Sequence, residues 1–448
     1  MLFASLGALG ACQGLQLRAT PAPRASVPDA AAPALPVDAG PPRAEQEPPR
    51  VEQKLTRKLN VVLVTIDTLR FDLGFAGYAR PVSPHLDALA ARGTVFERAY
   101  ATAPYTMKSL AALLTGRYTS EAHRDWQHYT HYYDDNVFLA KRIHATGART
   151  VAAMCHRYFA MKAGFEQGFD VFDLTAIPPG MTDVDPRPTS AGLTNVALKR
   201  LTQADNAPSG DRRLFAWVHY FDPHFPYVTH AGAPDFKSME PTSANRARDV
   251  YDQEVWFTDQ HLGRLLDGIA KEPWGKDTAI IVTADHGESF GEKGHFRHGK
   301  ELWETIVRVP LVVYVPGIAP RRVAIKRGHI DLAPTILELM GIPVEGEPAL
   351  RGKSLVPDML AAPDAQLEER DVFMDVPEGA MNEPRRALVF GKSPGTKIVE
   401  RGKRFALHDL AVDPLEANDL AGDATRLTEA RSHFDAFVGK LAEKKAVR

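Results

Sequence analysis

Carboxylate and imidazole side chains follow several apolar runs of the sequence, at the points where those runs end. Asp67 follows NVVLVTI, and Asp285 and His286 follow TAIIVTA. Asp222 and His224 come after AWVHYF. A single aspartate after a strand is often only a helix N-cap, and a single histidine is often a hydrogen-bonded bystander. Their joint placement predicts a site with the mixed oxygen and nitrogen ligands that suit a divalent metal ion.

The segments around these residues alternate between strand and helix patterns. Continuous β-branched runs predict strands that are buried on both faces of a parallel sheet. Besides the runs above, strand patterns occur in ARTVAAMC and PLVVYVP, and helix patterns in SPHLDALAARG, TNVALKRLTQA, RDVYDQEVWFTDQHLGRLLDGIA and APTILELMG. This alternation predicts an α/β fold with a mostly parallel central sheet sandwiched by helices.

The last hundred residues have a different pattern. Short β-like pieces (DVFMDV, RALVFG, TKIVE and RFALHDL) are separated by Gly and Pro turns and precede a helical segment, RLTEARSHFDAFVGKLAEK. This pattern predicts a small antiparallel sheet. We therefore expect a catalytic α/β domain at residues 58–345 and a C-terminal lobe at 346–448 that completes the same fold.

Taken together, the motifs resemble the sulfatase family, within the alkaline-phosphatase-like superfamily. The matching blocks run in the family's order and span about residues 58–422: VTIDTLRFD, SPHLDALAARGTVFERAYATAP, TMKSLAALLTGRY, HYFDPHFPY, TADHGESFGEKGHFRHGKELWE with RVPLVVYVPG, HIDLAPTILELMGIP and FALHDLAVDPLEANDL. The resemblance implies hydrolysis of sulfuric or phosphoric esters with a divalent metal ion, and leaves Ca²⁺, Zn²⁺ and Mn²⁺ open.

The resemblance also implies metal ligands. Asp67 matches the family's first metal carboxylate, and Asp285 and His286 match the second metal-binding pair. In sulfatases another carboxylate directly follows the first, whereas Thr68 stands there in this chain. We therefore expect a less acidic site than the calcium site of the formylglycine sulfatases.

The nucleophile position departs from the sulfatase pattern. Sulfatases carry Cys or Ser, then any residue, then Pro-Ser-Arg, and maturation converts the Cys or Ser to formylglycine. This chain has Thr106 there, without the Pro and Arg. Alkaline-phosphatase-like relatives and phosphoethanolamine transferases use an unmodified Thr or Ser at this place. We predict that Thr106 is both a metal ligand and a metal-activated nucleophile, at a helix N-terminus that favours anions.

Other polar residues are expected to act on the substrate. Lys108 is predicted to be catalytic on the same turn as Thr106, and His224 is predicted to contact the ester oxygen or protonate the leaving group. Within GHFRHGK, the choice between His298 and Lys300 as the basic residue on the substrate stays open. For Arg70 and Lys300, a solvated surface position is an equal alternative. The predicted substrate-binding residues are Arg70, Ser109, His298 and Lys300.

Two other functions fit the same motifs. One is an envelope transferase of the phosphoethanolamine type, which the lack of membrane-spanning segments disfavours. The other is a non-catalytic binding lipoprotein of the same fold, which is disfavoured by the joint retention of Asp67, Thr106, Asp285 and His286. A small-molecule, glycan or lipid ester is the expected substrate. Lys and Arg number 54 against 56 Asp and Glu, so no nucleic-acid partner is expected.

The beginning of the sequence predicts an export signal. Residues 1–12, MLFASLGALGAC, resemble a bacterial lipoprotein signal with its lipid-accepting Cys12, although the segment before it has no Lys or Arg. Residues 13–57 are rich in Pro and Ala and predict a disordered linker. We therefore expect a cell-envelope location, either lipid-anchored through Cys12 or periplasmic or secreted.

Overall fold

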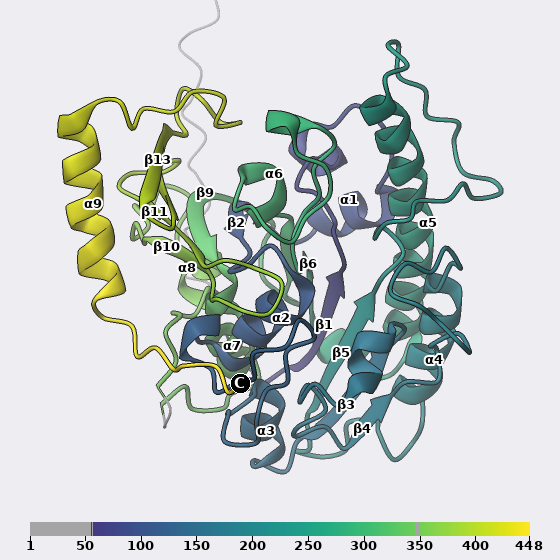
Figure 1. Ribbon diagram of the computed structural model, residues 1–448. Coiled ribbons are helices and arrows are strands. Elements are labelled where there is room, and N and C mark those ends of the chain that lie inside the picture. The colour runs from purple at the N-terminus through teal and green to yellow at the C-terminus, as the bar shows by residue number, and fades with distance from the viewer. Residues whose placement is uncertain (1–54, 56, 346–348) are drawn as a thin grey trace, which may run out of the picture. The chain divides into compact units, whose positions relative to one another are not determined.

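The computed structural model describes residue 55 and residues 57–345 and 349–448, so the predicted signal, Cys12 and most of the linker lie outside the described residues. The centre of the fold is a nine-stranded sheet in the order β4-β3-β5-β1-β6-β8-β2-β7, with β9 beside β2 (Figure 1). The strands are β1 (Asn60–Ile66), β2 (Thr94–Tyr100), β3 (Arg149–Met154), β4 (Val171–Asp173), β5 (Leu214–Tyr220), β6 (Thr278–Ala284), β7 (Arg308–Val309), β8 (Leu311–Tyr314) and β9 (Arg321–Gly328).

The strands that precede the predicted site form the parallel centre of this sheet. β1 pairs in parallel with β5 on one side and with β6 on the other, and every residue of these strands is buried. Burial on both faces explains why apolar residues dominate their sequences. β8 joins the sheet antiparallel to β6 and β2. The predicted mostly parallel sheet is confirmed.

Helices cover the sheet in two groups. α5 packs against α1 and α4, and α2 packs against α3 and α7. Figure 1 shows α4 and α5 on the right of the sheet, where α4 packs against β3 and β5. The helices are α1 (Pro84–Ala90), α2 (Thr106–Thr115), α3 (Leu139–His144), α4 (Ser190–Leu201), α5 (Ser243–Lys271), α6 (Glu304–Val307), α7 (Leu332–Leu339), α8 (Val356–Leu360) and α9 (Ala424–Val438). Within the described ranges, no helix is long and apolar enough to span a membrane.

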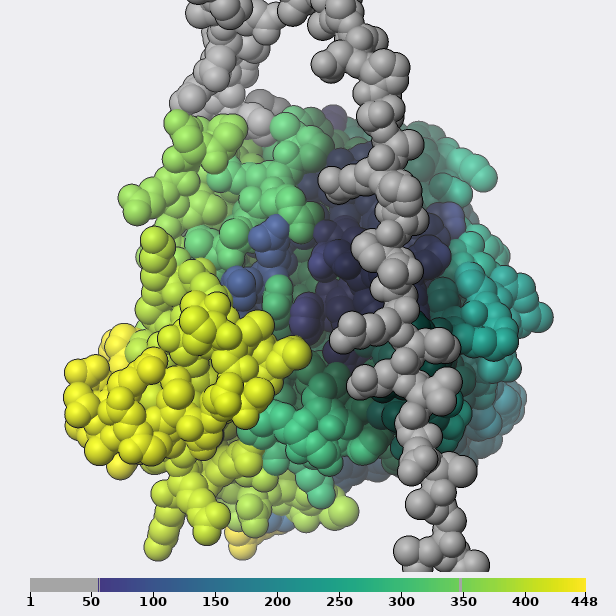
Figure 2. Space-filling view, turned by 90° about the horizontal axis from the view of Figure 1, so that it is seen from above, coloured from purple at the N-terminus to yellow at the C-terminus, as the bar shows by residue number. Residues whose placement is uncertain are grey.

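A second, four-stranded antiparallel sheet follows, as the sequence predicts. Its order is β10-β11-β12-β13, and its strands are β10 (Val372–Val376), β11 (Arg385–Phe390), β12 (Thr396–Arg401) and β13 (Arg404–Asp409). Phe434 of α9 packs on one face of this sheet, beside Phe373 and Ile398. Viewed from above, the yellow C-terminal segment and the teal region around α5 lie on opposite sides of the purple start of the described chain (Figure 2).

Candidate active site

The carboxyl ends of β1 and β6 bring the predicted metal carboxylates together. Ile66 lies in register with Ala284, so Asp67 and Asp285 leave the sheet side by side. Both carboxylates are fully buried. Asp285 Oδ1 accepts hydrogen bonds from the backbone N–H groups of Thr68 (3.1 Å) and His286 (2.8 Å). The sequence rule that strand ends collect reactive groups therefore holds for this pair.

Thr106 begins α2 and points at these residues. Its hydroxyl donates to Asp67 Oδ2 at 3.4 Å and lies 3.3 Å from His286 Nε2. His286 Nδ1 lies 3.0 Å from the carbonyl of Gly287 and donates its proton there, which leaves the lone pair on Nε2. The structure thus places Asp67 and His286 beside the Thr106 hydroxyl, and Asp285 Oδ2 lies 3.5 Å from the same His286 Nε2.

The two carboxylates leave oxygens without partners. Asp67 Oδ1 and Asp285 Oδ2 are buried and have no hydrogen-bond partner among the described residues. Burial opposes the charge of Asp67, yet the nearby imidazoles of His219, His224 and His286 hold its pKa below the usual range. Burial and the charge of Asp67 raise the pKa of Asp285. Two close, buried carboxylates with free lone pairs fit a divalent cation, which would neutralise both.

Two histidines that the sequence analysis did not name also lie here, His219 within the ligand group and His156 beside His224, at 6.4 Å between ring centroids. His219 lies on β5, and its Nε2 is 3.7 Å from Asp67 Oδ2. One ligand atom each of Asp67, His219 and Asp285 lies within 4.8 Å of the others. His156 follows β3 and stacks on Phe221, with ring centroids 3.9 Å apart. The sequence offered one signal for each: His219 lies inside a predicted strand, and His156 follows the end of another.

His224 and His298 line the neighbouring part of the site. Their ring centroids are 5.0 Å apart, and that of His298 is 4.4 Å from that of His286. Burial lowers the pKa of His224 to about 4, and its Nδ1 donates to the carbonyl of Phe225 at 2.6 Å. Burial opposes the charge of His298, but Glu288, 3.0 Å from its Nδ1, raises its pKa.

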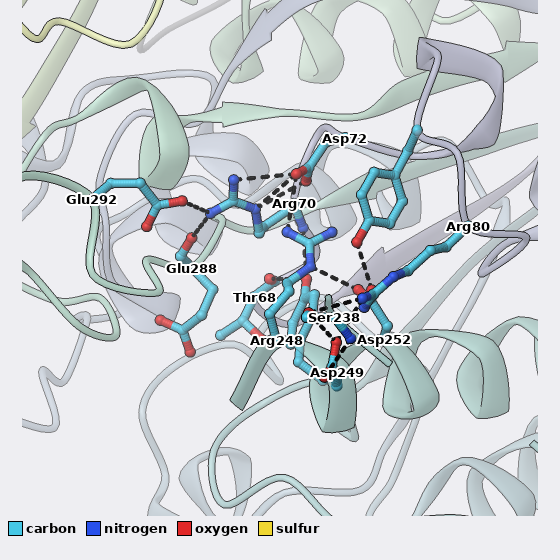
Figure 3. A network of polar contacts seen from close by, with 12 residues as sticks. Thr68, Arg70, Asp72, Arg80, Ser238, Arg248, Asp249, Asp252, Glu288 and Glu292 are labelled. Carbon is cyan, nitrogen blue, oxygen red and sulfur yellow. Dashed lines mark hydrogen bonds and ion pairs between the residues drawn. The ribbon is translucent and has the colours of Figure 1, made fainter. Parts of the chain in front are cut away.

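Arg70 is engaged within the protein (Figure 3). Its guanidinium donates to Asp72, to Glu292 at 2.8 Å and to the carbonyl of Glu288 at 2.7 Å. Arg248 binds the same Asp72 carboxylate at 3.0 Å. These contacts connect the segment after β1 to the segment that carries Glu288. Arg70 therefore stabilises the position of both segments.

The remaining predicted residues lie at varying distances from this group. The Ser109 hydroxyl donates to the carbonyl of Asp285 at 2.6 Å and thereby holds α2 against the end of β6. Lys108 is buried, and its ammonium donates to Asn382 of the C-terminal lobe at 2.6 Å. Burial, reinforced by Arg124, lowers the pKa of Lys108 to about 8. Lys300 is exposed to solvent.

Comparison with known proteins agrees with this fold. The family profile described as Sulfatase matches residues 59–342. The chain is 25% identical to a choline-sulfatase of Rhizobium meliloti, over 88% of this chain and 90% of the relative. It is also 25% identical to an ulvan-active sulfatase of Formosa agariphila, over 88% and 83% of the two chains.

Solved structures share the fold. A phosphonate monoester hydrolase of Agrobacterium radiobacter superposes with a TM-score of 0.67 at 21% identity, over 86% of this chain and 96% of that one. A 2-O GAG sulfatase gives a TM-score of 0.69 at 19% identity, over 86% and 92% of the two chains. Together, the family profile and the relatives define a sulfatase-like ester hydrolase. The chain belongs to the sulfatase family, because the family profile matches most of its length.

Proposed function

We propose that this enzyme cleaves sulfate and phosphate monoesters with Thr106 as an unmodified nucleophile, at a divalent metal ion held by Asp67, Asp285 and His286. The position of the Thr106 hydroxyl, 3.4 Å from Asp67 Oδ2 and 3.3 Å from His286 Nε2, carries this proposal. The unpartnered oxygens of the two aspartates support the metal.

The side chains divide the work as follows. Asp67 Oδ2 accepts the proton of Thr106, whose oxygen bonds to sulfur or phosphorus as the bond to the ester oxygen breaks. The departing oxygen takes up a proton from solvent. Water then bonds to sulfur or phosphorus as the bond to the Thr106 oxygen breaks, that oxygen takes its proton back from Asp67, and sulfate or phosphate is released. A bound cation would stabilise the threonine oxyanion and the charge on the transferred group.

His224 and His298 bind the oxygens of the substrate's ester group through Nε2. The Nδ1 atom of each ring is anchored, on the carbonyl of Phe225 and on the carboxylate of Glu288 respectively. Anchoring at Nδ1 fixes each ring and leaves Nε2 for a ligand, because an imidazole offers one nitrogen on each side.

Similarity to the relatives supports sulfate esters as substrates, whereas the proposed nucleophile supports phosphate esters. The chain is 25% identical to a choline-sulfatase and to an ulvan-active sulfatase, which supports sulfate esters. A metal-bound hydroxyl needs no aldehyde hydrate and is the arrangement of the family's phosphate-handling members. We therefore expect phosphate esters to be turned over at least as well as sulfate esters.

The test compares variants of Thr106 on nitrophenyl sulfate, phosphate and phosphonate esters. Thr106→Ala should lower kcat by about 10³-fold or more, and Thr106→Ser should keep part of the activity because it retains the hydroxyl. Undiminished turnover by Thr106→Ala would contradict the mechanism. Fast turnover of the sulfate ester alone by the unchanged protein would contradict only the expected phosphate preference.

A further inference from the structure

Three buried ligand atoms without partners face one another at the end of the sheet. They are Asp67 Oδ1, Asp285 Oδ2 and His219 Nε2, and none has a hydrogen-bond partner among the described residues. Ligand atoms of the same three residues lie within 4.8 Å of one another. A buried polar atom without a partner destabilises a fold, because burial removes its hydrogen bonds to water. A single cation would satisfy all three lone pairs.

The sheet fixes the imidazole of His219 toward this point. His219 lies opposite Thr65 in the parallel register of β5 and β1, and its Nδ1 is 2.7 Å from the Thr65 hydroxyl oxygen. Trp217 donates its indole N–H to the same oxygen at 2.9 Å, and Phe159 packs edge-on against the His219 ring. The ring is therefore held on one side by a hydroxyl and on another by apolar contacts.

The Thr65 hydroxyl can hold His219 in the tautomer that a metal ligand needs. A hydroxyl oxygen has two acceptor lone pairs, so it can accept from His219 Nδ1–H as well as from the Trp217 indole. In this tautomer the lone pair of His219 is on Nε2, the atom that faces Asp67 at 3.7 Å. Metal-binding histidines commonly have their other ring nitrogen anchored in this way.

We propose that His219 is a direct ligand of the metal ion, together with Asp67, Asp285 and His286. The donor set then contains two imidazoles and two carboxylates besides the Thr106 hydroxyl. Calcium prefers sites made wholly of oxygen ligands, whereas imidazole nitrogen suits zinc and other first-row transition ions. The site therefore selects a transition ion over calcium. This inference rests on the metal of the proposed function, but it is tested by metal binding and not by turnover.

The first experiment measures binding of Zn²⁺ and Ca²⁺ to the metal-stripped full chain, by equilibrium dialysis with elemental analysis. The unchanged protein should bind Zn²⁺ at least about 100-fold more tightly than Ca²⁺. His219→Gln should weaken Zn²⁺ binding by about 100-fold and leave Ca²⁺ binding within about threefold, because the loss concerns a nitrogen ligand. Asp285→Asn should weaken binding of both ions.

The chain offers a matched control in His329. This histidine is also buried, and its Nε2 bonds to the hydroxyl of Thr283 on the neighbouring strand at 3.0 Å. It lies outside the ligand group of Asp67, His219 and Asp285. His329→Gln should leave Zn²⁺ affinity within about threefold, which separates loss of a ligand from loss of a buried ring.

A second measurement does not depend on the variant's folding. Zinc-edge X-ray absorption of the unchanged protein loaded with Zn²⁺ should show scattering from two imidazoles. One imidazole, or a His219→Gln protein with undiminished Zn²⁺ affinity, would overturn the assignment of His219. A protein that binds neither ion would contradict the metal of the proposed function itself.

Discussion

At the residue scale, Lys108 is a buried cation whose hydrogen-bond acceptor is the neutral amide of Asn382. The pKa of Lys108 falls from 10.5 to about 8 because burial, and then the charge of Arg124, disfavour the ammonium. This difference corresponds to about 3 kcal/mol between the two protonation states. The folded protein therefore carries this charge at neutral pH at the expense of stability.

The pH dependence of stability follows from the sign of this shift. Between pH 8 and 10.5 the unfolded chain holds the Lys108 proton more firmly than the folded chain does, so the contribution of Lys108 to stability rises with pH. Lys108→Met should therefore be more stable than the unchanged protein at pH 7, and its advantage should shrink toward pH 10. Urea unfolding of both proteins at the two pH values measures the difference. An advantage that does not change with pH would contradict the buried charge.

The sequence predicts some site residues better than others, for a physical reason. Asp67, Asp285 and His286 follow apolar runs, so the ends of their strands could be located without the structure. His219 lies inside such a run, and the sequence does not indicate which side chains surround it. Glu288 contacts His298 because of how the loop between them folds, which the sequence does not reveal. Contacts of this kind depend on tertiary packing.

At the scale of elements, Asp222 follows the end of β5 and stabilises the start of a helix, α4. Its carboxylate accepts hydrogen bonds from the backbone N–H groups of Thr189 (2.6 Å) and Ser190 (2.8 Å), where α4 begins. The hydroxyl of Thr189 donates to the same carboxylate at 2.5 Å. Asp222 therefore caps α4 from the neighbouring strand, which is the structural alternative to metal binding.

A substitution distinguishes the two roles of Asp222. Asp222→Ala removes the cap and should lower the free energy of unfolding by about 1–2 kcal/mol. Metal content should be unchanged, because Asp222 is outside the group of Asp67, His219 and Asp285. Chemical denaturation and elemental analysis of the same preparation provide both values. Loss of the metal with unchanged stability would reverse the assignment.

Prediction of the strands depended on how apolar they are. β1, β5 and β6 are fully buried apolar runs, and each was predicted. β9, with the sequence RRVAIKRG, was not predicted, because its charged residues interrupt the apolar pattern expected of a strand that is partly buried. Lys326 and Arg327 are buried there because Glu369 (3.0 Å) and Asp358 (2.6 Å) pair with them from later in the chain.

At the scale of the whole molecule, the C-terminal lobe is bound to the catalytic body by buried polar contacts. Lys397 of β12 lies 2.9 Å from both Glu304 of α6 and Glu416. Asn382, between β10 and β11, accepts a hydrogen bond from Lys108, two residues after Thr106. The lobe thus contributes a residue to the surroundings of the candidate site.

The N-terminal sequence predicts where the enzyme is found. Residues 1–12 resemble a lipoprotein signal, so the mature protein should partition into the membrane fraction and into detergent. Cys12→Ser should release it to the soluble fraction or block its processing. Fractionation followed by immunoblotting measures this distribution. Equal partitioning of the two proteins would rule out Cys12 as the point of attachment.

Mass spectrometry of the peptide that contains Thr106 tests the central claim most directly. Active enzyme should contain unaltered threonine at this position before turnover. After acid quenching during turnover of a nitrophenyl phosphate ester, a fraction of the same peptide should carry a phosphoryl group on Thr106, because its hydroxyl forms the covalent intermediate. A chemically converted residue 106 in the active enzyme, or a phosphoryl group trapped on another residue with Thr106 free, would contradict the account.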